Sequence, residues 1–354
     1  MLVDLIIPTY KPDDSFLKLI EIMQSQSVSV NRIIIMNTEQ KFFERIVYSN
    51  SSINGYKNIE VKHISKKEFD HGKTRNKGVA RSEADYFLMM TQDAMPVGND
   101  LVKRLLNAFE EDDKVAVAYA RQVAADNAED SEKYAREFNY PVESATHSQS
   151  DVPSLGIKAY FCSNVCAMYR RDIFDELGGF MNHVIFNEDM LYAAKAINAG
   201  YRIAYVADAQ VIHSHNYSNK EYYKRNFDIG VSHAMHPDIF EGLNTKGEGM
   251  KLVRRTTNRL RSTGHFFGIF KVYVTSAYKY LGYRSGKHYT RLSKKAIMRK
   301  TLNPGFWIAH ELEMDRKSID AYKGYGRSSE ELEMMAKPPV SSSYKRPDPN
   351  QEAK

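Results

Sequence analysis

The chain has 354 residues, of which 42% are hydrophobic, so it is globular, with a core large enough for one large domain or two ordinary ones. Its two cysteines, Cys162 and Cys166, exclude a disulfide-rich secreted scaffold, and we expect them as buried thiols in a reducing compartment. Residues 251–300 hold fourteen Lys or Arg and no Asp or Glu; because the whole chain carries +6, the rest carries −8. The basic segment favours an anionic partner: a membrane surface, a nucleic acid or an acidic substrate.

The chain opens with an apolar strand pattern at residues 2–7, without the basic start and apolar stretch of a signal peptide. No uninterrupted apolar run approaches the roughly 20 residues that a membrane-spanning helix needs. We therefore expect a cytoplasmic protein.

Strands and helices alternate through the first two thirds of the chain. Strands are predicted at residues 2–7, 32–36, 59–64, 86–90, 115–121, 159–169 and 201–206. Helices are predicted at residues 15–26, 73–82, 99–111, 172–177 and 187–199. The polar stretch 124–153 is expected to be a loop or a small helical insert. This βαβ rhythm predicts an α/β fold with a mostly parallel, Rossmann-like sheet and helices on both faces.

The last third of the chain has a different character. From residue 217 to about 323 the pattern is helical, and from 328 onward it is rich in Pro and Ser. We therefore expect three parts, an α/β domain at 1–235, a basic helical region at 236–327 and a disordered tail at 328–354.

Asp93 follows the predicted strand 86–90, at the end of the strand where α/β sheets bind ligands. A carboxylate at this position can hold a hard cation and, through it, a diphosphate. Taken alone, it can equally begin a turn, because Pro96 follows closely.

Glu188 and Asp189 lie at the start of the predicted helix 187–199, directly after Asn187. Taken alone, the pattern favours a capped helix, because Asn is a good N-cap and acids in the first turn suit the helix dipole. The same position keeps a carboxylate ionised and able to accept a proton.

Two further segments carry polar side chains that suit a site. Residues 69–78 bring cations and Asn76 to a helix start, which suits phosphate contacts or a solvated basic face. His213 and His215 end the α/β region on the same side of a strand, as metal ligands or as hydrogen-bonded residues.

The order of these segments, preceded by Pro8-Thr9-Tyr10 and Asn37-Thr38-Glu39, resembles the family 2 glycosyltransferases, which have the GT-A fold. The resemblance covers about residues 1–235. Phe-Asp-His-Gly-Lys-Thr-Arg-Asn at 69–76, followed by Thr-Gln-Asp-Ala at 91–94, resembles the rhamnosyltransferase branch.

The resemblance implies a role for each matching residue. The donor nucleotide sugar would be bound by Pro8, Thr9, Tyr10, Asn37 or Glu39, His71, Arg75, Asn76 and Gln92. Thr91-Gln92-Asp93 matches an Asp-x-Asp metal motif whose first acid is Thr, so Asp93 would hold Mg²⁺ or Mn²⁺ with His213 or His215. Asp189, beside Glu188, would be the general base of a direct displacement that inverts the anomeric carbon.

The basic C-terminal region contains an amphipathic pattern at residues 266–281. On a helical wheel, eight apolar residues share one arc, opposite Lys271, Thr275, Ser276 and Lys279. With the surrounding cations, this pattern favours an anionic membrane surface over packing on its own domain or in a homodimer. Nucleic acid ranks third, because no recognised nucleic-acid motif accompanies the charge.

The sequence therefore predicts a metal-dependent inverting glycosyltransferase on the inner face of the cell membrane. The resemblance implies dTDP-L-rhamnose as the donor and a lipid-linked cell-surface polysaccharide intermediate as the acceptor. Three alternatives stay open at this point: another donor such as UDP-glucose or UDP-galactose, a nucleotidyltransferase, and a non-catalytic basic membrane adaptor.

Overall fold

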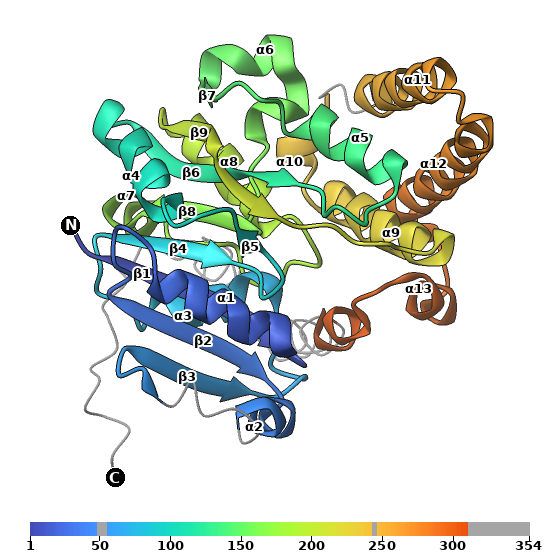
Figure 1. Cartoon of the computed structure of the whole chain (residues 1–354). Coiled ribbons are helices and arrows are strands. Elements are labelled where there is room, and N and C mark those ends of the chain that lie inside the picture. The colour runs from blue at the N-terminus through green and yellow to red at the C-terminus, as the bar shows by residue number, and fades with distance from the viewer. Residues whose placement is uncertain (48–54, 243–245, 311–354) are drawn as a thin grey trace, which may run out of the picture.

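The computed structural model describes residues 1–47, 55–242 and 246–310, and it contains one large sheet with helices on both faces (Figure 1). The strands are β1 Val3–Tyr10, β2 Arg32–Thr38, β3 Ile59–Ile64, β4 Tyr86–Met90, β5 Met95–Pro96, β6 Val115–Val123, β7 Ala145–His147, β8 Cys166–Arg170 and β9 Arg202–Ile212. The helices up to the end of the sheet are α1 Asp14–Gln24, α2 Gln40–Val47, α3 His71–Val79, α4 Leu101–Glu111, α5 Asp130–Asn139, α6 Val152–Leu155, α7 Arg171–Glu176 and α8 Glu188–Asn198. Those beyond it are α9 Asn219–Met235, α10 Pro237–Phe240, α11 Lys246–Ser262, α12 Phe266–Lys287 and α13 Lys294–Lys300.

The strand order is β3-β2-β1-β4-β8-β6-β9-β5, with β7 paired to β9. Neighbouring pairs among β3, β2, β1 and β4 are parallel, and so is β6 with β9, whereas β8, β5 and β7 run the other way. The prediction of a mostly parallel sheet is confirmed.

The apolar runs of β1, β2 and β4 follow from this architecture, because strands covered on both faces need apolar side chains on both. On one face Leu5 and Leu88 pack with α1 and α4, and on the other Ile6 and Phe87 pack with α3, α7 and α8. The two cysteines are buried free thiols, as expected.

The order of the strands gathers the polar segments at one edge of the sheet. The chain order reverses at β1, which lies between β2 and β4, and α/β sheets bind ligands at such a switch point. Because β8 is antiparallel to β4, its first residue, Cys166, lies opposite Met90, the last residue of β4. The residues just before β8 therefore meet those just after β4.

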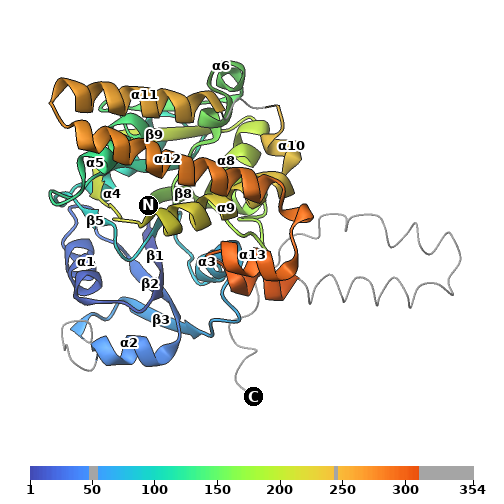
Figure 2. The ribbon, with the colours of Figure 1, turned by 90° about the vertical axis from the view of Figure 1, so that its right-hand side faces the viewer.

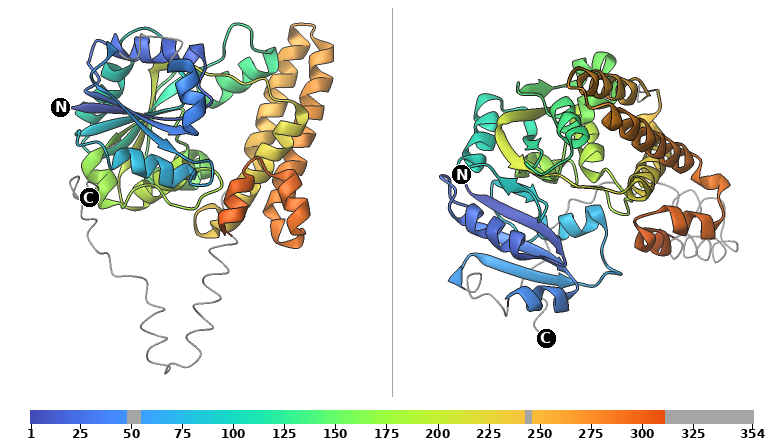
Figure 3. Two further views of the ribbon diagram at one scale, coloured as in Figure 1. Left: turned by 90° about the horizontal axis from the view of Figure 1, so that it is seen from below. Right: turned by 45° about the vertical axis from the view of Figure 1, so that its right-hand side comes forward.

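The C-terminal helices lie to one side of the sheet, where α11 and α12 form a neighbouring pair (Figures 2 and 3). Helix α12 packs closely along α9, since a Cβ on Gly282 would lie 2.2 Å from the Tyr223 carbonyl oxygen, and one on Gly286 2.0 Å from that of Phe227. Only glycine permits so close an approach of two helices.

The sequence located most elements but missed α2, β5, α6 and β7. Helix α5 lies in the stretch 124–153, which was expected to be a loop or a small helical insert. The strand predicted at 159–169 was wrong in its first half. There the chain forms a 3₁₀ turn, Gly156–Tyr160, and the strand begins only at Cys166. Ala159 and Tyr160 bury their side chains in the core from that turn, which a short apolar run does not reveal. The predicted disordered tail lies outside the described residues.

Candidate active site

Asn37 and Glu39, the two candidates for contact with the base, have different surroundings at the end of β2. Asn37 is fully buried, accepts a hydrogen bond from the Thr9 hydroxyl (3.1 Å) and donates one to Nδ1 of His63 (2.9 Å). Glu39 is partly exposed, with a left-handed backbone (φ 68°), and accepts a hydrogen bond from the Lys66 N–H. Of the two, only Glu39 is open to solvent.

Tyr10 ends β1 with an exposed ring. That ring meets the ring of Phe42 edge-to-face at 5.7 Å, and the ammonium groups of Lys11 and Lys66 lie within 6 Å of it. The side-chain amide of Gln92 accepts a hydrogen bond from the Tyr10 N–H (2.9 Å) and donates one to its carbonyl (3.1 Å). Gln92 therefore joins the ends of β1 and β4, and Tyr10 presents an aromatic surface edged with positive charge.

Asp93, His213 and His215 come together after β4 and at the end of β9. An Asp93 oxygen lies 3.6 Å from Nε2 of His213 and 3.4 Å from Nε2 of His215. Burial would raise the pKa of Asp93, but the hydrogen bond and charge of His213 outweigh it and hold the pKa well below its usual range. Burial, with His213 beside it, lowers the pKa of His215 to about 4. An ionised carboxylate and a neutral imidazole are the forms that bind metals.

Gln122, which the sequence did not single out, orients His213. Its side-chain oxygen lies 2.9 Å from Nδ1 of the buried His213, and its amide group donates to Ser163 and Tyr140. Because a carbonyl oxygen can only accept, Nδ1 of His213 carries a proton, and Nε2, which faces Asp93, is the nitrogen left to bind a cation. Metal-binding histidines are commonly held in this way. The three ligand atoms lie within 4.8 Å of one another, so this set fits a divalent cation.

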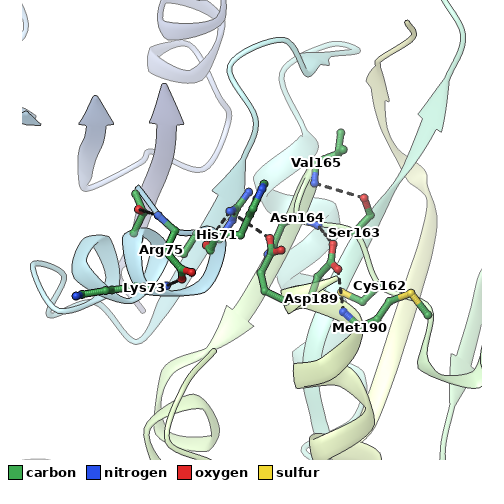
Figure 4. Close-up of polar contacts among 12 residues, drawn as sticks. His71, Lys73, Arg75, Cys162, Ser163, Asn164, Val165, Asp189 and Met190 are labelled. Carbon is green, nitrogen blue, oxygen red and sulfur yellow. Dashed lines mark hydrogen bonds and ion pairs between the residues drawn. The ribbon is translucent and has the colours of Figure 1, made fainter. Parts of the chain in front are cut away.

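Glu188 and Asp189 begin α8, and their carboxylates have different partners. Figure 4 shows Asp189 with its neighbours Asn164 and Met190. Glu188 is buried and pairs with the Arg75 guanidinium at 3.2 Å. Asp189 is partly exposed and forms no ion pair among the described residues. Asn187, the residue before them, has a left-handed backbone (φ 66°) and makes no side-chain cap, so the capping role favoured by the pattern alone is not observed.

The surroundings of Glu188 and Asp189 give the two carboxyl groups different pKa values. Burial would raise the pKa of Glu188, but the positive charge of Arg75 lowers it, so Glu188 is ionised. Burial and the negative charge of Glu188 raise the pKa of Asp189 to about 7. Two adjacent carboxylates driven apart in this way are typical of acid–base sites.

Asn164 connects both carboxylates and was also missed. Its side-chain amide donates to Glu188 (3.0 Å), its backbone N–H donates to Asp189 (3.0 Å), and its side-chain oxygen accepts from the Tyr169 hydroxyl (2.7 Å). Asn164 lies just before β8, inside the longer strand predicted at 159–169. A residue inside a strand is not expected at a sheet edge, so Asn164 was not predicted as a site residue.

Asn76 and His71, also predicted to bind the donor, contact other parts of the protein. Asn76 bonds the backbone of Phe180 in both directions (2.7 and 3.0 Å), and His71 packs between the rings of Phe69 and Phe186. Their proposed contact with a ligand remains a prediction.

The chain matches a family model, two relatives in sequence and a solved structure in fold. Residues 4–178 match the family model described as Glycosyl transferase family 2. The chain is 37% identical to the O-antigen chain rhamnosyltransferase RfbN of Salmonella typhimurium, over 87% of this chain and 96% of the relative. It is also 37% identical to the O-antigen chain rhamnosyltransferase WbaN of Salmonella anatum, over 86% of this chain and 95% of the relative.

Among solved structures, the mannosyltransferase PcManGT from Pyrobaculum calidifontis, in complex with GDP-Man and Mn²⁺, superposes with a TM-score of 0.55 at 11% identity. The match covers 82% of this chain and 88% of that one. At this identity the likeness concerns the fold, and it agrees with the expected GT-A architecture.

Proposed function

Since this chain belongs to glycosyl transferase family 2, we propose that it transfers L-rhamnose from dTDP-L-rhamnose to a hydroxyl group of a lipid-linked O-antigen intermediate. The observation that carries the proposal is the likeness to two O-antigen chain rhamnosyltransferases over nearly their whole length. The site residues around Asp93 and Asp189 supply chemistry suited to such a transfer.

Asp189 is proposed as the general base, with the anomeric carbon inverted in a single displacement. Its carboxylate is partly exposed, and a pKa of about 7 lets it take a proton from the acceptor hydroxyl near neutral pH. Glu188 supports this role by holding Arg75 and, through its own charge, raising the pKa of Asp189.

Asp93, His213 and His215 would hold the divalent cation. A bound cation would neutralise charge on the leaving diphosphate. Both histidines would serve as ligands, since both lie within reach of one cation together with Asp93. Gln122 would keep His213 in the ligating tautomer.

The donor nucleotide would lie along the carboxyl ends of β1 and β2. Pro8, Thr9 and the exposed Tyr10 would line the base and ribose, with Glu39 rather than Asn37 as the reachable polar group. Arg75 would contribute as a structural cation paired with Glu188.

We further propose that α12 and the basic region around it attach the protein to an anionic membrane surface. No described helix is long and apolar enough to cross a membrane. Two rings of the predicted apolar face of α12, Phe266 and Phe270, are at least 67% exposed, and the adjacent Phe267 is 83% exposed. Of the predicted polar face, Thr275, Ser276 and Lys279 turn inward, and Thr275 bonds Asn219. An outward aromatic face beside clustered cations suits the headgroup region of a bilayer.

The donor assignment is tested by incubating the purified protein with Mg²⁺ or Mn²⁺ and a panel of nucleotide sugars, without acceptor. We expect slow hydrolysis of dTDP-L-rhamnose and a raised melting temperature with dTDP, and neither effect with UDP-glucose, UDP-galactose or GDP-mannose. Preferential hydrolysis of another nucleotide sugar would replace the proposed donor.

A further inference from the structure

A cavity of about 1410 Å³ lies between the metal-ligand cluster and the C-terminal helices. It begins at His215 and Tyr217, runs between α9 and α12, and is bounded by parts of α5 and α11. This volume exceeds that of an ordinary small-ligand pocket, which is roughly 300–1,000 Å³. Because one wall is His215, whatever occupies the cavity lies beside the proposed donor diphosphate.

The wall contributed by α12 is its inward, polar face. Thr275, Ser276 and Lys279 line the cavity, and Lys271, Arg284 and Lys287 of the same helix also border it. A helix that turns its polar face inward and its aromatic face outward reverses the usual arrangement of a surface helix. Apolar side chains, among them Ile157, Phe240, Val253 and Val272, line the rest of the cavity. The lining therefore suits an occupant that joins a polar group to an apolar part.

The cavity lining holds four basic side chains, Lys271, Lys279, Arg284 and Lys287, against the carboxylates of Glu129, Glu132 and Glu241. Glu129 is paired with Lys271, and Glu132 with Arg136, so neither of these two neutralises Lys279. Lys279 is partly buried, with its ammonium 4.2 Å from the centre of the Tyr222 ring, and it forms no ion pair among the described residues. Lys287 donates a hydrogen bond to the His233 carbonyl, at 3.4 Å.

A half-buried ammonium in a roomy cavity is best satisfied by an anion that enters from outside. Burial lowers the pKa of Lys279, so the cation is held there at a cost that a bound anion would offset. Compact anions with several oxygens, phosphate above all, match the three donors of a lysine ammonium.

We infer that this cavity is an acceptor site, in which Lys279, assisted by Lys287, binds the phosphate or diphosphate group of an amphiphilic acceptor. The inference rests on the proposed function and deepens it: the sugar end of the acceptor would face His215, and its apolar chain would leave toward the exposed aromatic face of α12. One helix thus serves the anionic group with its inner face and the lipid environment with its outer face.

The test uses farnesyl diphosphate as a probe that carries the diphosphate and a prenyl chain but no sugar. Binding is measured by calorimetry on the full chain in EDTA, so that no metal can hold the diphosphate at Asp93. Farnesol, with the chain alone, and inorganic pyrophosphate, with the anion alone, separate the two parts of the ligand. Lys279→Met is compared with Lys220→Met, a matched change at an exposed lysine of α9 outside the cavity lining.

We expect Lys279→Met to weaken farnesyl diphosphate binding roughly tenfold, as loss of a charge-assisted hydrogen bond does, and Lys220→Met to leave it within about twofold. Farnesol should bind more weakly than farnesyl diphosphate and be insensitive to Lys279. Equal binding by the two variants, farnesol binding as tight as that of the diphosphate, or displacement of the probe by dTDP would each overturn the inference.

Hydrolysis of dTDP-L-rhamnose with Mn²⁺ separates this inference from the proposed function. If even the wild-type protein hydrolyses no nucleotide sugar, the proposed function fails, while the farnesyl diphosphate measurements still decide the anion site.

Discussion

The two neighbouring carboxylates at the start of α8 should respond in opposite ways to removal of their charge. The folded-state pKa of Asp189 is about 7, above its ordinary value of 3.8, so folding favours its protonated form. The stability that this provides is complete below about pH 4 and is lost as the pH rises through about 7. Asp189→Asn should therefore be more stable than the wild type at pH 8, with a smaller difference at pH 5, and should lose transfer activity.

Glu188→Gln is the matched comparison, measured by thermal unfolding in the same buffers. The pKa of Glu188 is lowered, so its charge contributes stability above its ordinary pKa, which is lost on acidification. Removing it leaves the charge of Arg75 buried without its carboxylate partner, which typically costs about 3–5 kcal/mol. If Asp189→Asn is destabilised as strongly as Glu188→Gln at pH 8, Asp189 is an ordinary structural carboxylate.

Gln122 should matter for metal affinity although it lies outside the ligand set. Gln122→Met removes the acceptor for Nδ1–H of His213 and frees the imidazole to rotate or change tautomer. Loss of such a partner typically lowers metal affinity roughly 10–100-fold, which Mn²⁺ titration would measure. Gln40→Met, at an exposed position of α2, is the control, and equal Mn²⁺ affinity in both variants would remove the proposed role.

The outward face of α12 can be tested for membrane attachment separately from the active site. Replacing Phe266, Phe267 and Phe270 together by Ser should strongly reduce sedimentation with anionic vesicles, because each exposed ring offers apolar area for the headgroup boundary. Val142→Ser, at a residue 71% exposed elsewhere on the surface, should sediment like the wild type. A wild-type dimer in vesicle-free solution that the triple variant converts to monomer would assign this face to self-association instead.

The helices and strands predicted correctly have regularly spaced apolar residues. The site residues that were missed lie where this spacing is irregular or misleading. Tyr86–Met90 and Ile59–Ile64 were located to the residue, because apolar runs of that length between polar turns are unambiguous. Asn164 was missed because apolar and polar residues alternate around it as in a strand, although these residues do not form one. The apolar arc of α12 was identified correctly, but only the packing against α9 shows that it faces outward.

For the whole molecule, the site depends on contacts between distant parts of the chain. Asp93 and His215 are brought together by the pairing of β5 with β9, and Arg75 and Glu188 by the packing of α3 near α8. The sequence order of these residues sufficed to indicate the family. Which of Asn37 and Glu39 is open to solvent depended on burial that the sequence pattern does not contain.

Metal removal tests the assembled site. We expect EDTA to abolish transfer and Mn²⁺ to restore it better than Mg²⁺, because two imidazoles and one carboxylate suit a softer cation than Mg²⁺. The melting temperature should rise with dTDP only when the metal is present. Full activity in EDTA after exhaustive dialysis would show that the three residues serve another purpose.

The glycine contacts between α9 and α12 have a consequence for how the protein behaves away from membranes. Backbone meets backbone at Gly282 and Gly286, so α12 has a single rotational setting about its own axis and cannot roll its aromatic rings inward. The amphiphilic character of the surface is therefore permanent rather than switched on by a partner. Purified protein should need detergent or lipid for long-term storage. Its adsorption to surfaces should depend on the exposed rings of α12 and not on whether the active site holds a ligand.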